Sequence, residues 1–341
     1  MEQHITNEKD NYLFNLERKE SFIADMVTNG NISESTAKSY ERILSYSARV
    51  EYALNKDLSD FNLEEIEKVL FGFNANNRNT VESYSRILSS YLNWSVQKGF
   101  SSNNPLYELK PDDFVKYLTD EETYFTNRQL KRWENHLENF QDAVIIRLLF
   151  IGVGGKQLSE IRNLKIQDVD RKNKTLKLTN TLKYDEKTGL PLKFTERYLD
   201  IEDDSTFDLI EGAIRTKKYV KRNGEVSEGA EARSIGMLEL VENDYVIRSS
   251  ITKTDNFNYP VDKFVIYRRL SMVSDVFGID NFTAKLIQRS GMIYYANQIM
   301  QGDILTLDDM KIVADKFNIK SYHNLKGFLT TENVKKTYGK D

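Results

Sequence analysis

Residues 150–170, FIGVGGKQLSEIRNLKIQDVD, combine a glycine pair with a lysine, and these residue types can hold a phosphate group. Backbone N–H groups of a glycine turn and a lysine ammonium group both bind phosphate oxygens. A nucleotide-binding loop would need glycine in place of Phe150 and serine or threonine in place of Gln157, directly after Lys156. The stretch therefore excludes that loop. It predicts a helix end, a glycine turn and a new helix beginning near Gln157 and Leu158.

The surrounding elements predict a mainly helical protein with a small β-hairpin. Apolar residues recur at helical spacing within residues 33–54, 62–73 and 77–100, and a capped helix is predicted from Thr126. In the 77–100 segment, Asn79 and Glu82 have the spacing of a helix-capping pair. Residues 175–184 and 190–201 instead alternate around a turn, which predicts the hairpin.

Bulk properties restrict the class of protein. The chain has 341 residues, 40% hydrophobic and 29% charged, with a net charge of −4 and no cysteine. These values predict a soluble, cytoplasmic protein without disulfides or a membrane span. His4, His136 and His323 lack metal-ligand spacing, so we expect neither a metal nor a cofactor. The overall charge argues against a generally basic nucleic-acid binder, but local patches decide phosphate attraction.

Three motifs in order resemble those of the tyrosine recombinases, the phage integrases. GGKQLSEIRNLKIQDVD is similar to the family's first catalytic motif, with Lys156 where the family has arginine. Asn79 to Pro105 resembles its DNA-binding core domain, and KTGLPL, containing Lys187, resembles the hairpin motif with the general-acid lysine. NFTAKLIQRSGM resembles the second motif, where Arg289 matches an arginine and Leu286 replaces histidine.

The resemblance covers most of the chain and implies a two-domain tyrosine-recombinase-like fold. We expect an N-terminal extension at 1–30, a helical core-binding domain at 31–110, a linker at 111–124 and an α+β catalytic-like domain at 125–341. Recombinases of this family cleave DNA with a tyrosine nucleophile and need no metal. Two arginines bind the phosphate, while histidine and lysine transfer protons.

Several of these groups are replaced in this sequence. Lysine lacks the planar, two-pronged donor of arginine, and leucine cannot transfer a proton. If Phe317, Asn318 and Ile319 replace the Leu-Gly-His of the third motif, Phe328 occupies the nucleophile position. Phenylalanine has no hydroxyl group, so no catalytic residue is expected. The degenerate positions are Lys156, Lys187, Leu286, Arg289, Ile319 and Phe328.

The resemblance therefore predicts a protein that holds double-stranded DNA without cutting it, most simply a prophage transcriptional repressor controlling the lysogeny–lysis decision. The candidate DNA-binding residues are Lys38, Arg42, Arg78, Arg86, Lys156, Lys183, Lys187 and Arg289. A homo-oligomer on DNA and a regulatory protein or peptide partner both stay open.

Two other functions also stay open. The chain could be an active recombinase that uses Tyr338 or Tyr322, or an accessory protein that has lost DNA binding. Each candidate cation also has a structural interpretation. Lys156 could be a solvated lysine at a helix start, Arg289 could pair with Glu160 or another acid, and the helix and hairpin cations could be ordinary surface charges.

Overall fold

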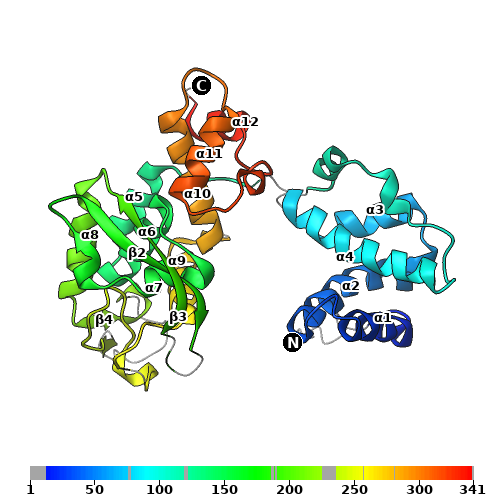
Figure 1. Ribbon diagram of the computed structural model, residues 1–341, viewed down its shortest axis with the longest axis horizontal. Helices are drawn as coiled ribbons and strands as arrows, with labels where there is room; N and C mark the ends of the chain where they lie inside the picture. Colours follow the sequence, from blue (N-terminus) through cyan, green and yellow to red (C-terminus); the bar gives the residue numbers. More distant parts are fainter. Residues whose placement is uncertain are drawn as a thin grey trace, which may run out of the picture. The chain divides into compact units, whose positions relative to one another are not determined.

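The computed structural model describes residues 13–339 except 76–77, 119–121, 186–187, 189, 225–235, 256 and 280. Within this part of the chain the protein is mainly helical with a small antiparallel sheet, which confirms the predicted fold class. The chain forms two compact units, residues 1–122 and 123–341 (Figure 1). Lys187, a predicted site residue, lies outside the described residues.

The first unit is a helical bundle. Its helices are α1 (Leu16–Thr28), α2 (Glu34–Leu54), α3 (Leu63–Phe71) and α4 (Arg78–Gln97), with 3₁₀ turns at Leu58–Asp60, Pro105–Glu108 and Pro111–Tyr117. The predicted apolar faces form its core, in which Leu44, Ile66 and Leu88 are fully buried. Helix α1 falls within the stretch predicted as an extension, yet its Phe22 is fully buried against Trp94.

The predicted cap of α4 is wrong. The helix begins at Arg78, so Asn79 lies inside its first turn rather than before it. The Glu82 carboxylate accepts a hydrogen bond from Arg78 Nε at 2.6 Å, one helical turn away. By contrast, Thr126 and Gln129 form the predicted reciprocal cap at the start of the next helix.

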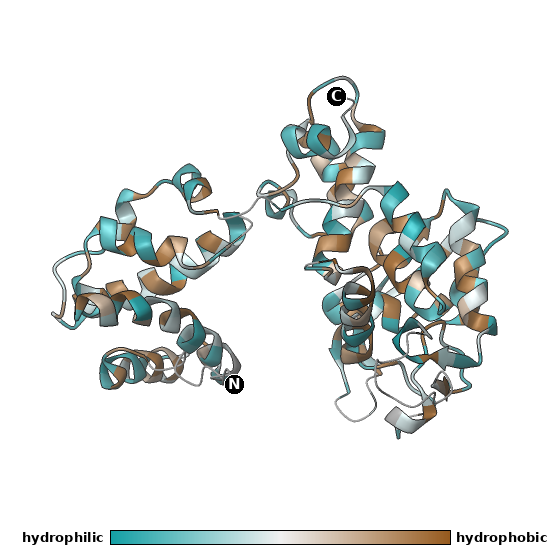
Figure 2. Ribbon diagram, turned by 180° about the vertical axis from the view of Figure 1, so that it is seen from behind, coloured by the Kyte–Doolittle hydropathy of each residue, from teal (hydrophilic) through white to brown (hydrophobic). Residues whose placement is uncertain are grey.

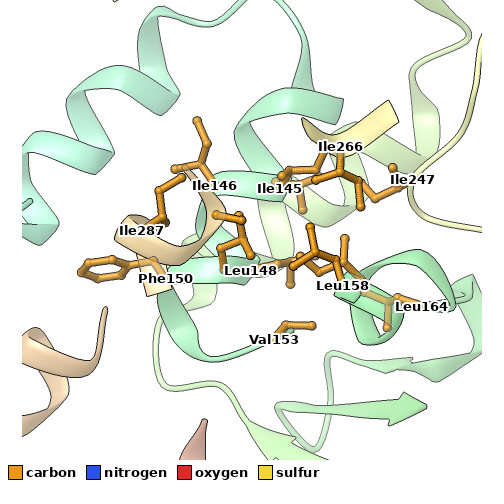
Figure 3. Packing of buried hydrophobic residues seen from close by; sticks show 14 of the residues in the cluster. Ile145, Ile146, Leu148, Phe150, Val153, Leu158, Leu164, Ile247, Ile266 and Ile287 are labelled. Carbon is orange, nitrogen blue, oxygen red and sulfur yellow. The ribbon is translucent and has the colours of Figure 1, made fainter. Parts of the chain in front are cut away.

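The second unit packs helices around a buried central helix and a three-stranded sheet. Its helices are α5 (Asn127–His136), α6 (Phe140–Ile151), α7 (Ser159–Arg162), α8 (Asp204–Arg215), α9 (Lys263–Phe277), α10 (Ala284–Ile299), α11 (Leu307–Lys316) and α12 (Thr331–Tyr338), with 3₁₀ turns at Lys156–Leu158, Ile166–Asp168, Lys221–Gly224, Ile251–Lys253 and Tyr322–Asn324. Nearly all of α6 is buried, and Figure 3 shows Ile145 and Leu148 surrounded by apolar side chains such as Ile266 and Ile287. Burial on most sides explains why this helix consists mainly of apolar residues.

The predicted hairpin is confirmed. Strands β2 (Thr175–Tyr184) and β3 (Pro191–Asp200) pair antiparallel, and β1 (Val169–Asp170) extends the sheet in the order β1-β2-β3. A second small sheet joins β4 (Lys218–Val220) to β5 (Met237–Glu239). Most helices contain both hydrophilic and hydrophobic residues (Figure 2), as is typical of a helix that packs through one face. None of the described helices has the length and apolar character needed to cross a bilayer.

Candidate nucleic-acid interface

The glycine turn after α6 has an unusual backbone. Gly155, Gln157 and Leu158 have φ values of 72°, 54° and 60°. Positive φ is strained for a bulky side chain such as leucine, so neighbouring groups must hold this conformation. Asn180 Oδ1 on β2 accepts a hydrogen bond from Lys156 N at 2.9 Å. The regular helix predicted near Gln157 therefore begins only at Ser159, after a 3₁₀ turn.

A buried carboxylate fixes this turn to the rest of the unit. Glu160 is fully buried and accepts hydrogen bonds from Gly154 N at 2.8 Å, Arg197 Nε at 2.8 Å and Asn318 Nδ2 at 3.0 Å. Arg197 also donates to the Lys316 carbonyl oxygen at 2.8 Å. We call Gly154, Glu160, Arg197 and Asn318 the Glu160 network. Arg197, and not Arg289, is the ion-pair partner of Glu160, whereas a pairing of Arg289 with another acid stays a prediction.

Lys156 and the hairpin come together at the surface. Lys156 is exposed, and its Nζ donates to the Leu182 carbonyl oxygen at 3.0 Å. Lys183, the next residue on β2, is also exposed. The two predicted phosphate-contacting lysines therefore lie on adjoining backbone segments.

Arg289 lies next to the same turn on α10. The preceding residue, Gln288, donates to the Val153 carbonyl oxygen at 3.4 Å. Arg289 is 5% exposed, and its guanidinium carbon lies 4.6 Å from the ring centroid of Phe328. The residue predicted at the nucleophile position therefore faces the retained arginine with an aromatic ring that has no hydroxyl group.

The other positions around the predicted cleavage pocket are apolar. Leu286 is 6% exposed within the main core, and Ile319 packs against the core formed by α10, α11 and α12. Neither side chain carries a group that can donate or accept a proton.

The two alternative tyrosines have structural contacts. The Tyr338 hydroxyl accepts a hydrogen bond from Asn127 N at 3.1 Å, and its ring packs on Tyr294. Burial raises the pKa of the Tyr338 phenol well above its ordinary value, which disfavours the nucleophilic phenolate. The Tyr322 ring lies against the adjacent His323, with centroids 4.1 Å apart.

An open groove of about 580 Å³ adjoins the glycine turn. Its walls include Gly155 and Gln157 from the turn, and Lys285 and Gln288 from the first turns of α10. The start of a long helix has a positive electrostatic end, which favours phosphate. This groove is lined by the two segments that carry Lys156 and Arg289, the glycine turn and α10.

The predicted DNA-binding cations of the first unit fall into two groups, those that pair with a described carboxylate and those that do not. Arg78 pairs with Glu82 at 2.6 Å and Asp112 at 3.0 Å, and Arg86 pairs with Glu82 at 3.4 Å. These pairs give Arg78 and Arg86 a structural role on α4. Phosphate contact by either arginine would have to compete with a carboxylate.

Helix α2 instead carries cations that no described carboxylate pairs with. Lys38, Arg42 and Arg49 are exposed and lie within about 40° of one another around the helix axis, at roughly 100° per residue. Arg42 Nη2 donates to the Tyr84 hydroxyl at 3.2 Å, which orients its guanidinium. We call Lys38, Arg42 and Arg49 the α2 stripe. Sequence reasoning missed Arg49, although its spacing from Arg42 places it on the same face.

The folds of DNA recombinases are similar to this fold. A lambda integrase dimer bound to a COC′ core site matches with a TM-score of 0.53 and 12% identity, over 95% of this chain and 96% of that chain. The Tn1549 transposon integrase in complex with circular intermediate DNA matches with a TM-score of 0.52 and 14% identity, over 93% of this chain and 94% of that chain. The predicted tyrosine-recombinase-like fold is thereby confirmed.

Sequence comparison identifies the family more closely. Residues 13–97 match the model of the MrpR N-terminal core-binding domain, and residues 124–339 match that of the MrpR C-terminal catalytic domain. The chain therefore belongs to the MrpR family. It is 26% identical to the SPbeta prophage-derived uncharacterized protein YopR of Bacillus subtilis (strain 168), over 96% of this chain and 98% of that protein.

Proposed function

We propose that this protein binds specific double-stranded DNA sequences without cleaving them, and that it acts as a prophage transcriptional repressor in the lysogeny–lysis decision. The observation that carries the proposal is the Phe328 ring, 4.6 Å from the guanidinium of Arg289. A transesterification needs a nucleophile beside the bound phosphate, and phenylalanine has none. Leu286 and Ile319 also cannot transfer a proton at the positions where the family resemblance leads us to expect histidine.

The cations support DNA binding. The α2 stripe in the first unit, and Lys156 and Lys183 in the second, expose positive charge that phosphate can neutralise. The lambda and Tn1549 integrases of similar fold are DNA-bound in their structures, and YopR is prophage-derived. A cytoplasmic location and assembly of copies on paired half-sites are parts of the same proposal.

Active recombination is the weaker alternative. It would require Tyr338 to leave its hydrogen bond with Asn127 N and its contact with Tyr294, or Tyr322 to leave His323. Either tyrosine would then act without the histidine of the family's second motif.

DNA binding is tested by selecting fragments of the host genome on the full-length protein and titrating the selected duplex. We expect log Kd to rise linearly with log salt concentration, and Lys156→Gln to reduce the slope by about 0.9 for one lost phosphate contact. Lys218→Gln, at an exposed lysine on β4, is the matched control. Absence of a salt-dependent complex with any selected duplex would contradict the proposal and favour an accessory role.

A further inference from the structure

A small cavity in the second unit has no role in the DNA-binding proposal. It has a volume of about 70 Å³ and lies among α6, α10, α11 and the segment between β3 and α8. Its walls include Tyr294 and Tyr295 of α10, and it shares no lining residue with the 580 Å³ groove. One water molecule needs about 10–15 Å³ of such space, so roughly five to seven non-hydrogen atoms fit.

Two deeply buried polar side chains line the cavity and retain unused hydrogen-bonding capacity. Thr206 is fully buried, and its hydroxyl bonds to no described residue. Arg147 is 2% exposed and uses its terminal nitrogens on Asn127 Oδ1 at 2.8 Å and Glu134 Oε2 at 2.7 Å, while its Nε bonds to no described residue. Leaving a buried polar group unpaired is energetically unfavourable, so such groups point to a ligand or ordered water.

Opposite charges also line this cavity. Lys316 is half-buried, with its ammonium 4.2 Å from the ring centroid of Tyr295, and burial lowers its pKa. Asp200 and Glu202 are exposed and form part of the same lining. None of these three charges forms an ion pair within the described part of the chain. The buried side therefore offers donors, and the exposed side offers carboxylates.

We infer that this cavity binds a small α-amino acid as its zwitterion. The ligand carboxylate accepts hydrogen bonds from Arg147 Nε, the Thr206 hydroxyl and the Lys316 ammonium, and the ligand ammonium faces Asp200 and Glu202. A plain carboxylate would leave the acidic side unmatched, and a plain amine would leave the buried donors unmatched. The volume selects amino acids of the size of glycine, alanine or serine.

Calorimetric titration of the full-length protein with L-alanine, acetate and ethylammonium tests the assignment. L-Alanine is expected to bind saturably and at least tenfold more tightly than acetate or ethylammonium at equal ionic strength. Acetate or ethylammonium binding as tightly as L-alanine would overturn the zwitterion assignment. A lack of saturable heat with L-alanine would mean that the cavity holds water only.

Variants locate the site. Thr206→Val keeps the side-chain volume and removes the hydroxyl, and we expect at least a tenfold loss of L-alanine affinity without a lower unfolding midpoint. Thr195→Val, at an exposed threonine on β3 outside the lining, is the control and should bind as the unmodified chain does. Lys316→Met is the second variant. Undiminished affinity in either Thr206→Val or Lys316→Met would overturn the site.

Discussion

At the scale of single residues, the region around Arg289 combines a buried cation with apolar side chains at the positions predicted for a nucleophile and a proton donor. Phe328 could be placed at the nucleophile position from motif spacing alone, and its ring does face Arg289. The partner of Glu160 could not be predicted in this way. Arg197 lies on the hairpin, and only the packing of β3 beside the glycine turn brings it to the Glu160 carboxylate.

The Glu160 network gives a stability prediction. Arg197→Met leaves the fully buried Glu160 charge without its cation, and we expect the free energy of unfolding to fall by about 3 kcal/mol. Urea denaturation measures this change. Arg171→Met removes two exposed ion pairs, with Asp208 and Glu211, and should cost less than about 1 kcal/mol. Equal losses in the two variants would show that Glu160 does not depend on Arg197.

A second residue-scale prediction concerns pH. Asp142 is buried on α6, and burial raises its pKa to about 6, against the Coulombic effect of Arg269. A raised folded-state pKa means that protonated Asp142 stabilises the fold below about pH 4. This contribution is lost as pH rises through about 6.

Asp142→Asn removes this titration. As pH rises from 4 to 7, we expect the free energy of unfolding of the unmodified chain to fall relative to that of Asp142→Asn. The fall should be on the order of 2–3 kcal/mol. Urea titrations across that range measure the difference, with Asp275→Asn, at an exposed aspartate on α9, as the baseline. A pH-independent difference for Asp142→Asn would show that Asp142 stays ionised when folded.

At the scale of elements, helical periodicity predicted α2, α3 and α4 of the first unit, and alternation predicted the β2–β3 hairpin, whereas α1 lies in the stretch predicted as an extension. Their surface charges were harder to interpret. The i, i+4 spacing of Arg78, Glu82 and Arg86 is readable from the sequence, but the second partner of Arg78, Asp112, comes from a distant segment. Only the folded unit therefore distinguishes the paired cations of α4 from the α2 stripe.

This distinction gives a prediction for DNA binding. We replace all three residues of the α2 stripe with glutamine (Lys38→Gln, Arg42→Gln, Arg49→Gln). The slope of log Kd against log salt concentration should fall by roughly 2–3, since each lost phosphate contact contributes about 0.9. The matched α4 variant, Arg78→Gln with Arg86→Gln, should change the slope by less than about 1. A larger effect of the α4 variant would place the DNA contact on that helix.

At the scale of the whole molecule, a net charge of −4 coexists with exposed cations in both units that pair with no described carboxylate. Total charge does not predict phosphate binding, because the field near a surface depends on which cations lack a neighbouring acid. The family resemblance predicted the overall architecture across most of the chain. It did not predict the small cavity, whose lining residues come from distant segments and belong to no motif.

The proposed function requires that this chain holds DNA without forming a covalent bond to it. The most direct measurement incubates the full-length protein with a selected duplex that carries a suicide nick, and resolves the products under denaturing conditions. We expect a complex in the native gel and no denaturant-resistant adduct. A covalent protein–DNA adduct that Tyr338→Phe or Tyr322→Phe abolishes would contradict it.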